Sequence, residues 1–173
     1  QRWDMQDGER NRIFEGWIEA HKAILFKVAR AYGASHADRE DLFQEMALQL
    51  WHSVPAFRGD SAASTWIYRV AFNTAIVWRR RERKHGKGRQ EIEAARGLLA
   101  EPAVRDPRLE WIYARIAGLG EIDRSLALLM LDGFSYRDMS LILGLGESNV
   151  GVRINRIKAA LAAQLAKEEH DEL

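Results

Sequence analysis

The chain has 173 residues, of which 47% are hydrophobic, so it is long enough for one large or two small domains with packed cores. Its net charge of +1 hides a segregation, since residues 38–60 hold five acids and two arginines whereas residues 79–89 hold seven basic residues and one acid. The absence of cysteine excludes disulfide bonds and thiolate metal sites, and the five histidines lack a ligand spacing such as H-E-x-x-H, so we expect neither a metal nor a cofactor.

Two amphipathic helices are predicted before Pro55. Apolar residues recur every three or four positions from residue 10 to 32 and stop before Gly33, which predicts a core helix. Ser35 is a typical N-cap for a second helix, which Pro55 ends. The outer face of this second helix carries acidic and amide side chains. Such a face is ordinarily solvated surface, and the alternative is a docking face for a basic partner. That face consists of Glu40, Asp41, Gln44, Glu45 and Gln49.

The stretch from Phe57 to Arg89 carries a second pattern, a loop at residues 58–64 followed by a helix that ends near Lys84. We expect its packing side to contain Trp66, Ile67, Val70, Ala71, Thr74 and Val77. We expect its exposed side to contain Tyr68, Arg69, Phe72, Asn73 and Arg80. Aromatic rings interleaved with Arg before a basic run suit a nucleic-acid strand, because cations neutralise phosphates and rings stack on bases. The alternative is that the rings are core residues and the basic run is a solvated helix end.

Residues 86–107 have weak periodicity and clustered Gly and Pro, a composition typical of a linker. A short helix over residues 91–99 is compatible with the apolar spacing there. We therefore predict an N-terminal domain over residues 1–85 and a C-terminal domain over residues 108–173.

The C-terminal part has the pattern of a helix-turn-helix. Ser135 with Asp138 resembles a capping box, Gly144 can adopt the left-handed conformation that ends a helix, and a new helix is expected near Glu147. The outward residues of this last helix are suited to base edges and phosphates of a duplex, although an ordinary helical hairpin would show the same pattern. They are Ser148, Asn149, Val152, Arg153 and Arg156. No strand pattern is present, and the predicted fold is all-α with two small helical domains.

Taken together, these segments resemble the extracytoplasmic-function group of sigma-70-type sigma factors. The resemblance covers nearly the whole chain and depends on three segments in order. These are REDLFQEMALQLW at residues 39–51, FRGDSAASTWIYRVAFN at residues 57–73, and GFSYRDMSLILGLGESNVGVRINRIKAAL at residues 133–161. The chain departs from the family pattern at Phe72 and Gly151, where many members have a basic residue.

The resemblance implies a subunit that joins core RNA polymerase, binds promoter DNA and is held by an anti-sigma factor or another regulatory protein; it implies no enzymatic activity of the chain itself. The polymerase-binding residues would be Asp41, Gln44, Glu45 and Gln49. The first domain would also open the −10 element, with contacts from Arg58, Gly59, Asp60, Ser61, Tyr68, Arg69, Asn73, Arg79 and Arg80. The second domain would read the −35 element through the outward residues of its last helix. No apolar run approaches the roughly 20 residues of a membrane span, so we expect a cytoplasmic protein with no direct membrane insertion.

Two other functions fit parts of the pattern. A helix-turn-helix regulator that does not join polymerase would use the last helix but leave the acidic face and the loop at residues 58–64 without a purpose. An α-helical protein-interaction module would have the basic run as solubilising surface, and it would show no salt-dependent DNA binding.

Overall fold

The structure is a computed structural model, and it describes residues 5–84 and 106–171. The chain divides into two compact units, Gln1–Val104 and Arg105–Leu173, and each is considered by itself. Every regular element within the described residues is a helix, which confirms the predicted all-α fold. The predicted linker at residues 86–107 lies outside the described residues except for Asp106 and Pro107, and the short helix over residues 91–99 lies wholly outside them.

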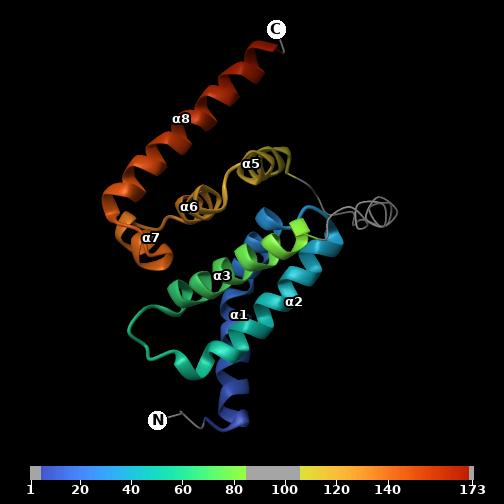
Figure 1. Cartoon of the computed structure of the whole chain (residues 1–173), viewed down its shortest axis with the longest axis vertical. Coiled ribbons are helices and arrows are strands. Elements are labelled where there is room, and N and C mark those ends of the chain that lie inside the picture. The colour runs from blue at the N-terminus through green and yellow to red at the C-terminus, as the bar shows by residue number, and fades with distance from the viewer. Residues whose placement is uncertain (1–4, 85–105, 172–173) are drawn as a thin grey trace. The chain divides into compact units, whose positions relative to one another are not determined.

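The first unit is a three-helix bundle in which each long helix packs against the other two (Figure 1). Its elements are α1 (Asp7–Tyr32), α2 (His36–Ser53), the short 3-10 helix η1 (Val54–Ala56) and α3 (Ala63–Lys84). The Ser35 hydroxyl accepts a hydrogen bond from the Asp38 backbone N–H at 3.1 Å, which confirms the predicted N-cap. The centre of the bundle is apolar and is formed by Leu25, Val28, Leu42, Met46, Leu50, Ile67, Ala71 and Ala75.

Helix α3 has the predicted period, and Ile67 and Ala71 are buried as predicted, but its buried face is wider than predicted. Tyr68 is 0% exposed and stacks on the equally buried Phe72, with ring centroids 5.3 Å apart. Val77, which we expected to pack inward, is 53% exposed. The prediction that Tyr68 and Phe72 face outward is therefore wrong. The helix packs against both α1 and α2, so its buried stripe is wide, and burying two large rings removes more apolar surface from water than burying Val77 would.

The second unit contains α5 (Pro107–Ala117), α6 (Glu121–Leu131), α7 (Tyr136–Leu143) and α8 (Glu147–Asp171). The buried side chain of Arg124 joins α5 to α6, because its Nη2 donates to the carbonyls of Ala117 and Leu119 at 2.6 and 2.9 Å. This pairing satisfies carbonyls at and just beyond the end of α5, where the helix itself supplies no donor.

Helices α7 and α8 form the predicted helix-turn-helix (Figure 1). The Ser135 hydroxyl accepts from the Asp138 backbone N–H at 3.1 Å, and Gly144 has φ +67°, so both the start and the end of α7 are as predicted. Only residues 144–146 separate the two helices. The two helices pack against each other, and their buried residues are apolar: Met139, Ile142, Val150, Ile154 and Ile157.

Candidate functional site

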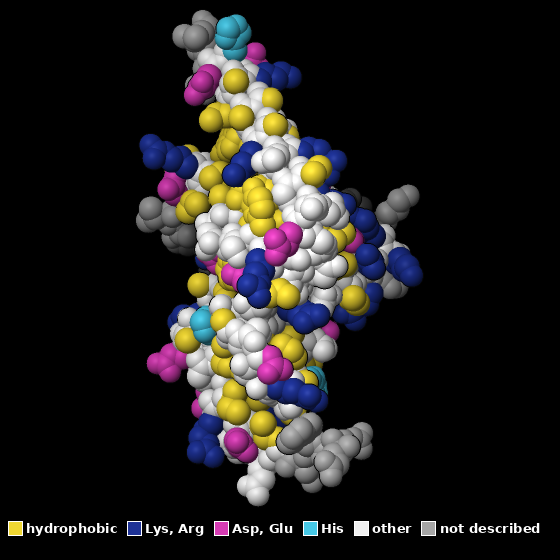
Figure 2. All heavy atoms as spheres, turned by 90° about the vertical axis from the view of Figure 1, so that its left-hand side faces the viewer, with side chains coloured by type: hydrophobic (Ala, Val, Ile, Leu, Met, Phe, Trp, Pro, Cys, Tyr) yellow, Lys and Arg dark blue, Asp and Glu magenta, His cyan; other side chains and the backbone are white. Residues whose placement is uncertain are grey.

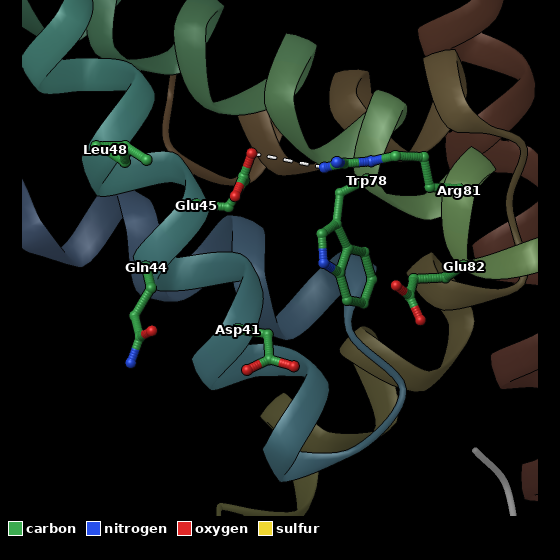
Figure 3. A pocket seen from close by; sticks show the side chains of 7 residues that line it. All are labelled: Asp41, Gln44, Glu45, Leu48, Trp78, Arg81 and Glu82. Atoms are coloured by element: carbon green, nitrogen blue, oxygen red, sulfur yellow. Dashed lines mark ion pairs between the residues drawn. The ribbon is translucent and has the colours of Figure 1, made fainter. Parts of the chain in front are cut away.

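The acidic face of α2 borders an open groove between α2 and α3. The groove has a volume of about 550 Å³ and brings Asp41, Gln44 and Glu45 together, as predicted for one face of α2. Figure 3 shows that α3 supplies the opposite wall. The other lining residues were not predicted from the sequence, and they are Leu48, Trp78, Arg81 and Glu82. Gln49, the fourth residue predicted to bind polymerase, is exposed but does not line the groove.

An ion pair crosses this groove. Arg81 Nη2 lies 3.5 Å from Glu45 Oε1, and the side chains are 57% and 33% exposed (Figure 3). Because an exposed pair of this kind is screened by water and salt, a protein partner can replace it at small cost. Beside the pair, Leu48 presents half of its surface to solvent. The groove therefore combines an apolar contact with three carboxylates and one amide, which suits a partner surface that carries basic residues.

An aromatic cluster holds the start of the loop that precedes α3. The Phe57 ring meets Trp17 at a centroid distance of 5.2 Å and Trp66 at 5.5 Å. Trp66 Nε1 also donates to the Ser53 hydroxyl at 3.1 Å, so the loop is closed at its base by ring contacts and a hydrogen bond. Gly59 has φ +76°, a conformation that other residues adopt only with strain. The four predicted loop residues are all exposed, and they are Arg58, Gly59, Asp60 and Ser61.

The exposed face of α3 continues from this loop. Arg69, Asn73 and Arg80 are exposed at spacings of four and seven residues, so they lie along one side of the helix, with Val77 between them. Cationic and amide groups beside an exposed loop can bind phosphates and hydrogen-bond unpaired bases.

Two residues predicted for this nucleic-acid face are engaged inside the protein. Tyr68 is in the core, so its ring cannot contact a nucleic-acid strand in this structure. Arg79 is half-buried, and its Nη1 donates to the Tyr32 carbonyl, at the C-terminal end of α1, at 3.3 Å. The Arg79 guanidinium supplies a donor to a carbonyl in the last turn of α1, where the helix itself has none, and this accounts for its inward direction.

Five residues of α8 were predicted to face outward and contact DNA. Four of them are exposed, namely Ser148, Asn149, Val152 and Arg156. The fifth, Arg153, is half-buried and held on two sides. Its Nε donates to Asn149 Oδ1 at 3.2 Å, and its Nη1 donates to Asp123 Oδ1 on α6 at 2.8 Å. Asp123 could not be found from the sequence pattern, because only the fold brings together two residues that are 30 positions apart.

A separate apolar pocket of about 210 Å³ lies between α5, α6 and α8. Leu131 and Leu165 line it, and each has about half of its surface exposed. Figure 2 shows hydrophobic side chains open to solvent along α8, the helix at the top. At one end Glu168 pairs with Arg115 at 3.2 Å and accepts from Trp111 Nε1, which holds the C-terminal part of α8 against α5.

The described residues contain no group of three or more His, Asp or Glu side chains placed to hold a metal ion. Within the same residues, no helix has both the length and the hydropathy of a membrane span.

Comparison with known proteins identifies relatives over most of the chain. Residues 17–85 match the family model described as sigma-70 region 2. The RNA polymerase sigma factor CnrH of Cupriavidus metallidurans is 29% identical over 168 residues, which span 89% of this chain and 87% of that protein. The ECF RNA polymerase sigma factor SigM of Mycobacterium tuberculosis is 27% identical over 157 residues, which span 88% of this chain and 76% of SigM. The ECF RNA polymerase sigma-E factor of Escherichia coli is 28% identical over 141 residues, which span 72% of each protein.

Solved structures give the same fold. The structure of CnrH in complex with the cytosolic domain of CnrY aligns with a TM-score of 0.67 at 23% identity, over 93% of this chain and 92% of CnrH. The sigma factor RpoE of Bartonella quintana, in complex with the anti-sigma factor NepR, aligns with a TM-score of 0.67 at 22% identity, over 90% of this chain and 98% of RpoE. Residues 17–85 therefore match sigma-70 region 2, and over most of its length the chain is similar to sigma factors of the extracytoplasmic-function group.

Proposed function

We propose that this chain directs core RNA polymerase to a restricted set of promoters and helps to open them, with the two units dividing the work. The domain over residues 1–85 would join polymerase and hold the −10 element, and the domain over residues 108–173 would read the −35 element as duplex. Sigma factors are transcription initiation factors rather than enzymes, so the polymerase would supply the chemistry. The protein would act in the cytoplasm, where polymerase and promoters are.

The observation that carries the proposal is the exposed loop at residues 58–61, which leads into α3 with its exposed residues Arg69 and Asn73. Its base is fixed by the Phe57 contacts to Trp17 and Trp66. Opening a duplex costs unstacking and unpairing energy, and a preformed surface that binds an unpaired strand recovers part of that cost.

The groove between α2 and α3 supports the polymerase contact. Its carboxylates and the Gln44 amide lie beside exposed Leu48, so a partner with basic and apolar side chains would bury an apolar centre within a polar rim. No residue lines both the groove and the strand-binding surface, so both partners could be bound at once.

A regulatory partner is part of the proposal. The solved RpoE structure contains the anti-sigma factor NepR, and the solved CnrH structure contains the cytosolic domain of CnrY. We propose that a protein of this kind holds the present chain away from polymerase. The apolar pocket between α5, α6 and α8 offers such a protein a surface on which to bury apolar side chains.

Transcription from randomised promoter DNA tests the proposal directly. Purified chain and core polymerase are mixed with a DNA library that core polymerase alone does not transcribe, and the DNA from open complexes is sequenced. We expect two selected elements and unpaired bases in the downstream one. An Asn73→Ala variant should keep its affinity for polymerase and form fewer open complexes. Duplex binding without polymerase binding would instead support a regulator that acts alone, and binding of neither would support a protein-interaction module.

A further inference from the structure

We propose that Asp123 of α6 is a positioning residue that fixes the Arg153 guanidinium and so sets base selectivity in the upstream promoter element. The inference rests on the proposed function of α8 as the duplex-reading helix. Asp123 Oδ1 accepts from Arg153 Nη1 at 2.8 Å, and the two side chains are 24% and 27% exposed. This contact joins the recognition helix to a helix outside the helix-turn-helix.

The second contact of Arg153 makes its orientation definite. Its Nε donates to Asn149 Oδ1, one turn earlier on α8, at 3.2 Å. The guanidinium is thus held at two nitrogens, by residues from two helices. Because a guanidinium is planar and has more N–H donors than these two contacts use, the remaining donors are directed from a fixed plane.

A fixed plane matters because arginine can bind DNA in two ways. A mobile guanidinium contacts any phosphate within reach, which adds affinity without sequence information. A guanidinium held in one plane can donate two parallel hydrogen bonds to a guanine edge and loses less side-chain freedom in doing so. Asp123 favours the second mode, and its negative charge also lowers the attraction of Arg153 to phosphates in general.

The partial burial of the pair supports a positioning role over an incidental surface contact. Both side chains are less than a third exposed, so solvent competes with the contact less than it does for the Glu45 and Arg81 pair in the first unit, whose arginine is 57% exposed. The recognition residues Asn149 and Arg156 stay exposed on the same helix, so the pair leaves the rest of the reading face open.

The test uses the full chain with core polymerase and promoter DNA in which the upstream element is randomised. Open complexes formed with wild type, Asp123→Asn, Arg153→Ala and the double variant are sequenced. We expect the wild type to prefer one base on the order of tenfold at one or two positions, and Arg153→Ala to lose that preference. Asp123→Asn should weaken the preference several-fold at those same positions and keep it at the others. The double variant should match Arg153→Ala.

Glu121→Gln is the matched control, because it removes the same charge from the same turn of α6. An unchanged preference in Asp123→Asn, an equal loss at every upstream position, or a further effect of Asp123→Asn in the Arg153→Ala background would overturn the positioning role. So would an Arg153→Ala variant that keeps every base preference. A wild type with no upstream preference at all would instead refute the proposed reading of the −35 element, and the positioning role would fall with it.

Discussion

The ring of Phe57 meets the ring of Trp17 edge to face, with the planes at 83° and the centroids 5.2 Å apart. This contact joins the segment after α2 to the middle of α1, and Trp66 on α3 also packs against Phe57. The exposed loop at residues 58–61 therefore begins at a point fixed by two of the three bundle helices. A loop that is fixed at its base loses less conformational freedom when it binds a strand.

Phe57→Ala should impair promoter opening more than polymerase binding. Because Phe57 is half-buried, we expect the variant to lose about 1 to 3 kcal/mol of stability, less than the loss of a fully buried ring. The measurement is open-complex formation at a temperature where the variant is folded. Trp66→Phe is the control: it keeps a ring beside Phe57 but removes the hydrogen bond to Ser53, at a cost of about 1 kcal/mol. Normal opening by Phe57→Ala would show that the ring contacts do not position the loop.

Leu48→Asp should weaken binding to core polymerase by about tenfold without unfolding the chain. Leu48 is 50% exposed beside the groove, so the stability of the variant should stay within about 0.5 kcal/mol of wild type. The new charge would have to be desolvated in an interface with polymerase, which costs binding energy. Titration of labelled core polymerase measures the effect.

Val77→Asp is the matched variant on α3. We expect it to impair open-complex formation and to spare polymerase binding. Val77 is similarly exposed but lies with Arg69, Asn73 and Arg80, so a carboxylate there would repel the phosphates of a bound strand. Polymerase affinity should remain, and open-complex formation should fall below that of wild type, most of all at low salt, where the repulsion is least screened. If both variants lost polymerase binding equally, the two surfaces would not be separate.

Arg79→Ala and Arg80→Ala should differ although the residues are neighbours. Arg79 donates to the Tyr32 carbonyl at the end of α1, so its loss should cost about 1 kcal/mol in denaturant unfolding and leave the salt dependence of DNA binding unchanged. Arg80 is exposed on the strand-binding face, so its loss should reduce the slope of log K against log salt by about one. Equal salt slopes for the two variants would argue that both arginines contact DNA.

The elements that could be predicted from the sequence depend on local chemistry. Ser35 and Ser135 mark helix starts because a hydroxyl three residues before a free N–H satisfies it, and the structure contains both hydrogen bonds. Gly144 marks the end of α7 because a residue without Cβ adopts positive φ at little cost. Such signals lie within a few residues of the feature they specify, so sequence inspection finds them.

The features that sequence inspection missed depend on tertiary packing. Tyr68 and Val77 are both compatible with a core or an exposed position, and only the packing of α3 against two helices decides between them. The hydrogen-bond partners of Arg79 and Arg153 lie 47 and 30 positions away in the sequence, so no local pattern predicts them. Arginine is common both on DNA-binding faces and at helix ends, which is why the sequence pattern groups Arg79 with the DNA-binding residues.

Two glycines of the helix-turn-helix should respond to alanine with opposite signs. Gly144 has φ +67°, and a Cβ added there would have no atom within 4 Å, so Gly144→Ala should cost about 1 to 2 kcal/mol from backbone strain alone. Gly151 lies inside α8, where an added Cβ would touch the Tyr136 ring at an ordinary 3.5 Å, so Gly151→Ala should stabilise the unit by about 0.5 to 1 kcal/mol. Hydrogen exchange of α7 and α8 amides in the full chain measures both changes. Gly144→Asn, which tolerates positive φ better, should lose less than Gly144→Ala, and equal losses would mean that backbone conformation is not the cause.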